Sequence, residues 1–171
     1  MKYLKITTFL FFLIALLFIS CEKDDICGEG TPTTPQLIVR FYDANAPEET
    51  KPVTDMLVYG LNDLSETVFF NSIALSTTDS ITVPLRTGSD VTRLVFHKDL
   101  DTSDFQTGNL DVIATNYERE DVYVSRACGF KTIFNNFQTN LEIDPNNWIV
   151  SVEIVVTTVE NQTSAHVKIY H

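Results

Sequence analysis

From Gln36 onward the apolar residues recur at every second position, between clusters of turn-forming residues, and no long helical stripe interrupts them. Leu37, Val39 and Phe41, for example, alternate with Ile38, Arg40 and Tyr42. Side chains two residues apart lie on the same face of a strand, so this spacing favours strands with one buried face. The chain is therefore predicted to be all-β.

Short strands separated by about 8 to 12 residues predict an antiparallel β-sandwich of about eight or nine strands, with a β-barrel as the alternative. The charged triplet 118–120 is expected to be the tip of a hairpin, and the β-branched run 149–156 a central strand. Segment 129–139 has mixed apolar spacing and is left open between a helical or irregular insert and a strand followed by a loop. The expected strands cover 37–42, 56–61, 67–75, 80–85, 90–98, 109–117, 121–125, 148–159 and 165–170.

Residues 1–20 form a separate segment that starts with two lysines and continues with an uncharged run from Ile6 to Ile19. The run has 14 residues, and a helix of that length covers about 21 Å, whereas a membrane-spanning helix needs about 20 residues. A basic start followed by a short apolar run is typical of a secretory signal peptide. A transmembrane helix and an ordinary secretory signal are the alternatives.

The leader ends in LFISC at 17–21, which resembles the end of a bacterial lipoprotein signal peptide. The resemblance implies cleavage before Cys21, a diacylglycerol on its sulfur and an acylated amino group. The following Lys23-Asp24-Asp25 resembles the signal that sends lipoproteins of the Bacteroidota to the outer face of the outer membrane. We therefore expect a lipid-anchored outer-membrane protein exposed at the cell surface. The alternative is a solvated tether on the periplasmic face.

Removal of residues 1–20 leaves 151 residues, enough for one domain with a sizeable core. Residues 21–35 are polar and rich in Gly, Thr and Pro, and they are predicted to form a lipidated tether before a single β-sandwich domain at 36–171. The leader holds two of the 12 basic residues and none of the 23 acidic ones, so the remaining chain has a net charge of −13. Such a charge repels nucleic acid and anionic headgroups, which leaves the N-terminal lipid anchor as the expected means of membrane attachment.

With Cys21 assigned to lipid, Cys27 and Cys128 remain. An exported protein with two remaining cysteines most simply pairs them, and two unrelated thiols are the alternative. A bridge here would close a loop of about 100 residues, for which the chain-entropy model gives about 4.7 kcal/mol as an upper figure. No Cys/His set has the spacing of a zinc site.

Cys21, the two later cysteines and the segment VSRACGFKTIFNN at 124–136 together resemble a family of uncharacterised Bacteroidota lipoproteins. The resemblance extends over nearly the whole chain after the leader. It implies a location and an architecture, and it carries over no activity and no functional residues.

Two short segments are weak candidates for a site. Asp99, Asp101 and Asp104 lie between two expected strands and offer oxygen ligands for a cation such as calcium. A solvated acidic turn is the alternative, because Asp and Ser favour turns. Asp79-Ser80-Ile81 resembles the acceptor at which Bacteroidota attach O-linked glycans, here on Ser80, and a turn that leads into a strand is the alternative.

The three histidines, His97, His166 and His171, belong to none of the known hydrolase or zinc motifs, so we expect no enzyme and no cofactor. His166 is expected to face solvent, and the terminal His171 to be mobile. The expected function is that of a structural or protein-interaction component of the envelope. The alternative is a glycan or small-ligand binding module built on exposed aromatic side chains. Candidates for such a platform are Phe69, Phe70, Tyr117, Tyr123 and Trp148, which in a β protein are more often core residues.

Overall fold

The computed structural model describes residues 26–31 and 33–171. They form two compact units: the disulfide unit, made of 26–31 with Tyr123–Phe130, and the sandwich unit, made of 33–122 with Lys131–His171. The leader, Cys21 and Lys23-Asp24-Asp25 lie outside the described residues, so the signal peptide, the lipidation and the tether stay predictions. Within the described part of the chain, no helix is long and apolar enough to cross a membrane.

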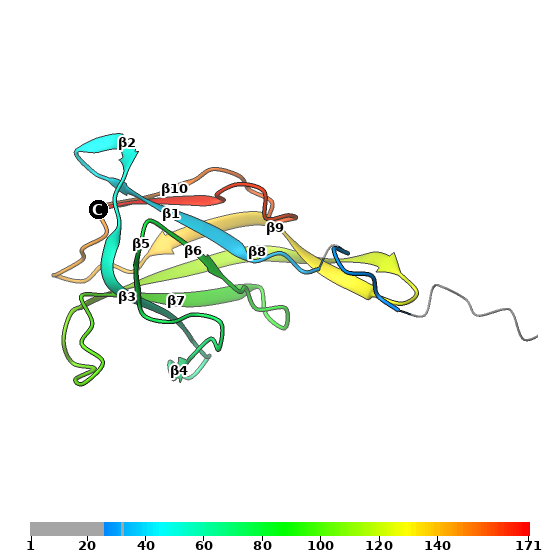
Figure 1. Cartoon of the computed structure of the whole chain (residues 1–171), viewed down its shortest axis with the longest axis horizontal. Helices are drawn as coiled ribbons and strands as arrows, with labels where there is room; N and C mark the ends of the chain where they lie inside the picture. Colours follow the sequence, from blue (N-terminus) through cyan, green and yellow to red (C-terminus); the bar gives the residue numbers. More distant parts are fainter. Residues whose placement is uncertain (1–25, 32) are drawn as a thin grey trace, which may run out of the picture. The chain divides into compact units, whose positions relative to one another are not determined.

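The predicted sandwich is confirmed: two sheets face each other and neither closes into a barrel (Figure 1). One sheet has the order β10-β11-β1-β2, with β6 also paired to β1, and the other has the order β4-β3-β7-β8-β9, with β5 also paired to β3. The strands are β1 Leu37–Asp43, β2 Ala46–Thr50, β3 Val53–Leu61, β4 Thr67–Val68, β5 Ser76–Thr78, β6 Ser80–Val83, β7 Val91–Lys98, β8 Asn109–Ser125, β9 Gly129–Leu141, β10 Ser151–Ile154 and β11 Val167–Tyr170.

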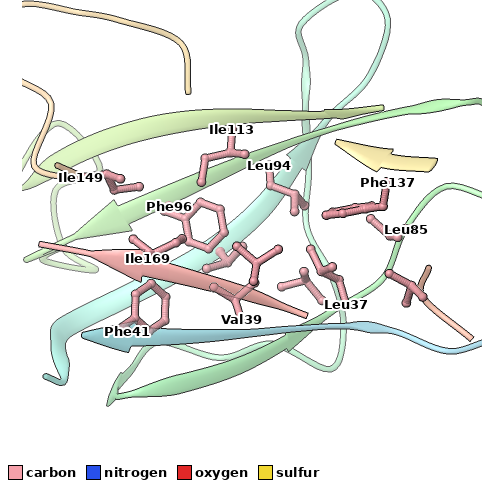
Figure 2. Packing of buried hydrophobic residues seen from close by; sticks show 14 of the residues in the cluster. Leu37, Val39, Phe41, Leu85, Leu94, Phe96, Ile113, Phe137, Ile149 and Ile169 are labelled. Atoms are coloured by element: carbon pink, nitrogen blue, oxygen red, sulfur yellow. The ribbon is translucent and has the colours of Figure 1, made fainter. Parts of the chain in front are cut away.

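The core fills the space between the inner faces of the two sheets. On β1 the predicted alternation is confirmed, because Leu37, Val39 and Phe41 are buried and the residues between them are more exposed. Phe41 meets Phe96 of β7 edge to face, with 6.2 Å between the ring centroids. Figure 2 shows these two rings among the other buried side chains of the cluster. Burial of each such large side chain contributes about 1.5–3 kcal/mol.

The hairpin predicted at 118–120 is wrong, because β8 runs without a break from Asn109 to Ser125. The charged residues there lie on the strand, and Arg119 and Glu120 form hydrogen bonds to neighbouring segments. Arg119 donates to the carboxylate of Asp90 at 2.6 Å and to the carbonyl oxygen of Thr87 at 2.6 Å. The charged residues at 118–120 therefore belong to a surface strand and do not form a turn. The chain turns later, between β8 and β9.

Segment 129–139 forms neither a helix nor a strand followed by a loop, since strand β9 extends over all of it. The mixed spacing has a backbone cause. Asn136 has a φ of +52°, a left-handed conformation that changes which face the following side chains occupy. Phe134 and Phe137 therefore both point into the core although they are three residues apart.

The run 148–159 is divided between the two sheets and is not the predicted central strand. Its β10 part lies at the edge of the first sheet and pairs with β11 in the expected terminal hairpin. Beyond β10 the chain pairs with β9 of the other sheet, where Phe137 donates to the Thr157 carbonyl at 2.8 Å and Phe134 and Val159 exchange two backbone hydrogen bonds. The residues of this one run thus pair with strands of both sheets.

The last strand, β11, pairs with β1 in parallel, whereas antiparallel connections were expected throughout. A parallel pair needs a long connection between its strands. Here nearly the whole chain lies between β1 and β11, so the requirement is met without a crossover helix. The pairing places the chain terminus beside the first strand, where the His171 amide donates to the carbonyl of Tyr42 at 3.0 Å.

The expected strand 67–75 is reduced to β4, Thr67–Val68. After it the chain turns, and the Ile73 amide donates to the Phe70 carbonyl at 3.1 Å. The Phe70 ring lies against Gly60 of β3, where an added Cβ would come within 3.1 Å of the ring. The Phe70 ring thus occupies the space that a side chain at position 60 would need.

The disulfide unit contains the predicted bridge. Cys27 and Cys128 are bonded, with 4.9 Å between their Cα atoms and a sequence separation of 101. The Cys128 amide also donates to the Ser125 hydroxyl at 3.1 Å, and Thr31 donates to the Gly28 carbonyl. The bridge joins the segment that follows the predicted anchor to the turn between β8 and β9.

Candidate functional site

Four rings meet on the outer face of the six-stranded sheet and form what we call the aromatic patch: Tyr59, Phe69, His97 and Phe105. The centroid distances are 5.6 Å for Tyr59–Phe69, 5.9 Å for Phe69–Phe105 and 5.9 Å for His97–Phe105. Tyr59 and His97 are buried, whereas Phe69 is 58% and Phe105 43% exposed. The patch thus has a fixed base and two phenylalanine rings open to solvent.

Strands β3 and β7 supply the base of the patch. Val58 of β3 and Phe96 of β7 point into the core, so their neighbours Tyr59 and His97 point to the other side of the sheet. Burial raises the pKa of the Tyr59 hydroxyl, so this group stays neutral at physiological pH. Leu110 of β8 pairs with His97, lies on the same outer face, and is exposed. It extends the apolar surface along the sheet.

His97 anchors the patch to the loop that follows β7. Its Nε2 atom lies 2.7 Å from the carbonyl oxygen of Thr107. Its Nδ1 atom is buried and has no hydrogen-bond partner among the described residues. The imidazole therefore holds the base of the loop through one nitrogen, and its ring packs edge to face with that of Phe105.

Phe105 is carried by the acidic loop, residues 99–108, whose shape comes from its own side chains. Asp101 Oδ1 accepts hydrogen bonds from the amide and the hydroxyl of Ser103, at 2.9 and 2.7 Å. The Ser103 amide bond, followed by its hydroxyl bond, lowers the pKa of the Asp101 carboxyl. Gly108 closes the loop at a φ of +76°, where a Cβ would lie 2.2 Å from the Lys98 carbonyl oxygen, so only glycine fits.

The three weak metal candidates lie in this loop. Asp101 and Asp104 use their Oδ1 atoms to accept backbone amides two residues ahead, and Asp99 lies 3.6 Å from the Lys98 ammonium. In the described part of the chain, no three His, Cys, Asp or Glu side chains are grouped so as to hold a metal ion. The Asp101 and Asp104 carboxylates thus stabilise turns, which is the alternative that the sequence left open.

The aromatic residues singled out from the sequence are dispersed. Tyr117 is buried in the core, and Trp148 is partly buried and packs against the core. Tyr123 belongs to the disulfide unit. The Phe69–Phe70 doublet is split, with Phe69 exposed in the patch and Phe70 packed against the core. Sequence reasoning missed Phe105. The available signal was a phenylalanine within a loop that is polar apart from Leu100 and Gly108.

The prediction that His166 faces solvent is wrong, because its ring is buried and bonded on both sides. Nδ1 accepts the amide of Ile38 on β1 at 2.9 Å, and Nε2 lies 2.9 Å from the Asn161 carbonyl oxygen. Burial lowers the pKa of His166, and the bond to Asn161 offsets this in part. The ring is thus a neutral structural link between β1 and the turn before β11.

The expected mobility of His171 is also wrong. Its Nε2 lies 3.0 Å from the Lys51 carbonyl oxygen, and its ring packs on Trp148 with 5.5 Å between centroids. Burial is the main cause of its lowered pKa. The chain terminus is therefore held by hydrogen bonds and ring packing.

We expect the stability of the protein to fall between about pH 7.5 and pH 5.5, because the unfolded His166 side chain, with a pKa near 6.5, takes up a proton before the folded one does. Protonation of Nδ1 would also remove the acceptor for the Ile38 amide. His166→Asn keeps an acceptor near that position and does not titrate, so the pH dependence should become shallower. Urea denaturation followed by tryptophan fluorescence at both pH values measures this.

His171→Gln is the control, since His171 contributes a pH dependence of the same sign. In each single variant the free energy of unfolding should depend less on pH than in the wild type, and in the double variant it should depend on pH least. An unchanged slope in both single variants would show that carboxylates, and not these imidazoles, control stability in this range.

Asp111 is a fully buried carboxyl on β8. Its Oδ2 accepts the Ile149 amide at 2.8 Å, while Oδ1 has no partner among the described residues. Burial raises the pKa of Asp111, and the Ile149 amide opposes the rise. The nearby Asp144 carboxylate adds to the rise, and through the Ile149 amide Asp111 fixes the segment before β10 against β8.

A cavity of about 260 Å³ lies beside the aromatic ring of Phe70. Its apolar wall includes Val68, Phe70 and Leu85, and Arg86 and Arg93 also line it. Arg93 forms two bonds of 2.8 Å to Glu142, and Arg86 pairs with Asp63, so each guanidinium in the wall already has a carboxylate partner. The space suits a small, largely apolar ligand.

Ser80 is the first residue of β6 and is half-buried. Its amide and its carbonyl oxygen both bond the Thr78 hydroxyl, at 3.2 and 2.8 Å. A turn that leads into a strand is what the structure shows at this point. Glycosylation of Ser80 stays a prediction.

A protein-family model matches residues 55–171, and the family is described as one of unknown function, DUF6452. The match covers the chain from β3 to its end, and therefore includes the aromatic patch and the acidic loop. No curated protein and no solved structure matches the chain.

Proposed function

The chain belongs to DUF6452, a family of unknown function, and from its own residues we propose that it is a lipid-anchored component of the cell envelope that binds another envelope protein and performs no catalysis. The proposed location is the outer membrane, with the domain at the cell surface; the periplasmic face is the alternative. The ending LFISC at 17–21 and the following Lys23-Asp24-Asp25 support this location.

The aromatic patch carries the binding proposal. Exposed phenylalanine rings gain free energy when a partner covers them, at about 25 cal/mol for each Å² of apolar surface removed from water. Phe69 and Phe105 project from loops, but their rings pack on each other and on the buried Tyr59 and His97, which reduces the side-chain entropy lost on binding. Phenylalanine also lacks the polar group with which tyrosine or tryptophan holds a sugar, so the patch fits a protein better than a glycan.

The charge around the patch indicates the chemistry of the partner. Phe105 lies in a loop that also exposes Asp99, Asp101 and Asp104, and the chain without its leader has a net charge of −13. An apolar surface rimmed by lysine or arginine would complement both features. Higher salt should weaken the complex, because the rim contribution is screened.

Cys21→Ala should release the protein from the membrane fraction, because the residue that carries the proposed lipid is lost. Cell fractionation followed by protease treatment of intact cells measures anchoring and surface exposure together. The matched control is the Cys27→Ser/Cys128→Ser double variant, which loses two cysteines and keeps the anchor. If Cys21→Ala stays with the membranes, the lipoprotein proposal is wrong; full protection of the wild type from protease would place the domain inside.

A photoreactive phenylalanine analogue at position 69 should crosslink one envelope protein in living cells. Phe105→Ser in the same molecule should lower the yield several-fold, since the second exposed ring is removed from the contact. This variant should cost about 1 kcal/mol of stability or less, because Phe105 is half exposed. Mass spectrometry of the crosslinked band identifies the partner and shows whether its contact surface is apolar with a basic rim.

The control position is Val150, which is exposed next to β10 in the other sheet. Equal crosslinking from 69 and 150, or a yield at 69 that does not respond to Phe105→Ser, would contradict the proposed contact.

The cavity beside Phe70 supports a second candidate, a small-ligand binding module. No tyrosine or tryptophan lines it, so an apolar ligand fits this space better than a glycan does. Protection of the wild type against thermal unfolding by such a ligand, lost when Leu85→Trp fills the cavity, would favour this candidate.

A further inference from the structure

The disulfide unit exposes three apolar side chains close to its bridge. Ile26 is 84%, Tyr123 56% and Phe130 66% exposed. The Tyr123 and Phe130 rings pack edge to face with 5.5 Å between centroids, so they present one joint surface. A unit of so few residues has too little interior to bury these side chains itself.

The disulfide connects this surface to the start of the exported chain. Cys27 is bonded to Cys128, in the turn that separates Tyr123 and Phe130. Ile26 precedes Cys27 directly, so all three exposed apolar side chains lie close in sequence to one of the two bridged cysteines. The Ser125 hydroxyl, which accepts the Cys128 amide at 3.1 Å, helps to fix the turn.

The distance from Cys21 to this turn has an upper bound. Cys27 follows Cys21 by six positions in sequence, and a fully extended chain of that length covers about 20 Å. If Cys21 carries lipid, the covalent path keeps the turn between β8 and β9 within that distance of the acyl chains. The headgroup layer then has a high effective concentration for this surface.

We infer that the turn between β8 and β9 rests in the headgroup region of the membrane that holds the lipid anchor, with Ile26, Tyr123 and Phe130 against the acyl boundary. This inference rests on the proposed lipidation of Cys21. Aromatic residues, above all tyrosine, prefer the membrane interface because the ring is apolar and the hydroxyl stays hydrated. The occupant is a lipid bilayer, since the tether holds the turn at one.

The test places a tryptophan reporter at this turn in the lipidated, full-length protein. Phe130→Trp is made in a Trp148→Phe background, so that the reporter is the single tryptophan, and the protein is reconstituted into phosphatidylethanolamine and phosphatidylglycerol vesicles. Some vesicles also contain phosphatidylcholine brominated near the headgroup end of its acyl chains, which quenches nearby tryptophan. Phe69→Trp in the same background is the control, because position 69 is as exposed but lies in the sandwich unit.

We expect the reporter at 130 to lose emission in brominated vesicles and to shift to shorter wavelength, and the reporter at 69 to do neither. Removal of the disulfide by Cys27→Ser/Cys128→Ser should reduce the quenching at 130. Vesicle flotation reports the anchor separately. Flotation without quenching at 130, or equal quenching at 130 and 69, would overturn the inference and leave the anchor intact; loss of flotation would overturn both.

A second measurement needs no tryptophan variant. Hydrogen–deuterium exchange of the wild-type protein in vesicles should show slower exchange for amides of 123–130 than the Cys21→Ala protein shows in solution. Equal exchange in the two samples would contradict the inference.

Discussion

Replacing Phe41 with alanine is expected to lower the free energy of unfolding by about 3–5 kcal/mol, because it leaves a cavity between the two sheets. Phe41 has no exposed surface, and its ring packs against Phe96 of the facing sheet and against Trp148 and His171. These partners belong to both layers and to the chain terminus, so the cavity cannot close by the movement of one segment. Urea denaturation followed by far-UV circular dichroism measures the loss.

The matched control is Tyr42→Ala at the next position of β1, whose side chain points to the other face of the sheet. Tyr42 is half-buried and packs on Tyr170 with 5.7 Å between centroids. Its removal should cost about 1 kcal/mol, the contribution of an aromatic pair at the surface. Equal losses at positions 41 and 42 would contradict the assignment of inner and outer faces.

Loss of the disulfide is expected to lower the free energy of unfolding by about 2–4 kcal/mol. The bridge spans 101 residues, which include every strand from β1 to β8, so it restricts the unfolded chain strongly. The full model value of about 4.7 kcal/mol is not expected, since 26–31 would regain freedom in the folded protein once the bridge is absent. Urea denaturation of Cys27→Ser/Cys128→Ser beside the wild type measures the difference.

The wild type in excess reductant is the control for this pair of substitutions. It should match the double variant if the bond itself, and not the packing of the sulfur atoms, supplies the stability. If reductant has no effect on the wild type although free thiols are detected, the chain-entropy argument fails for this protein.

A strand with one buried face could be predicted, because its apolar residues then occupy every second position in the sequence. Leu37, Val39 and Phe41 show this on β1. β9 lacks this alternation, because the left-handed Asn136 changes the phase between Phe134 and Phe137. β8 was divided in error at Glu118–Glu120, since charge in sequence does not reveal that Arg119 is bonded to Asp90.

The aromatic patch could be predicted only in part. Phe69 was a candidate, because adjacent strand residues face opposite sides and one member of a doublet is expected outside. Tyr59, His97 and Phe105 were not connected to it, since the four rings come from two strands and two loops that only long-range pairing brings together. The buried state of His166 likewise depends on the Ile38 amide, 128 residues earlier in the chain.

The amino-acid sequence by itself determined the all-β class, the alternation on β1 and the pair of cysteines that bond, because each depends on local periodicity or on chemistry with one available partner. Tertiary structure alone decided that β1 and β11 pair in parallel, that β10 is an edge strand, and that Phe69 and Phe105 meet on an outer face. The physical reason is that the alternation of apolar residues indicates which face of a strand is buried. It does not indicate which strand lies beside it.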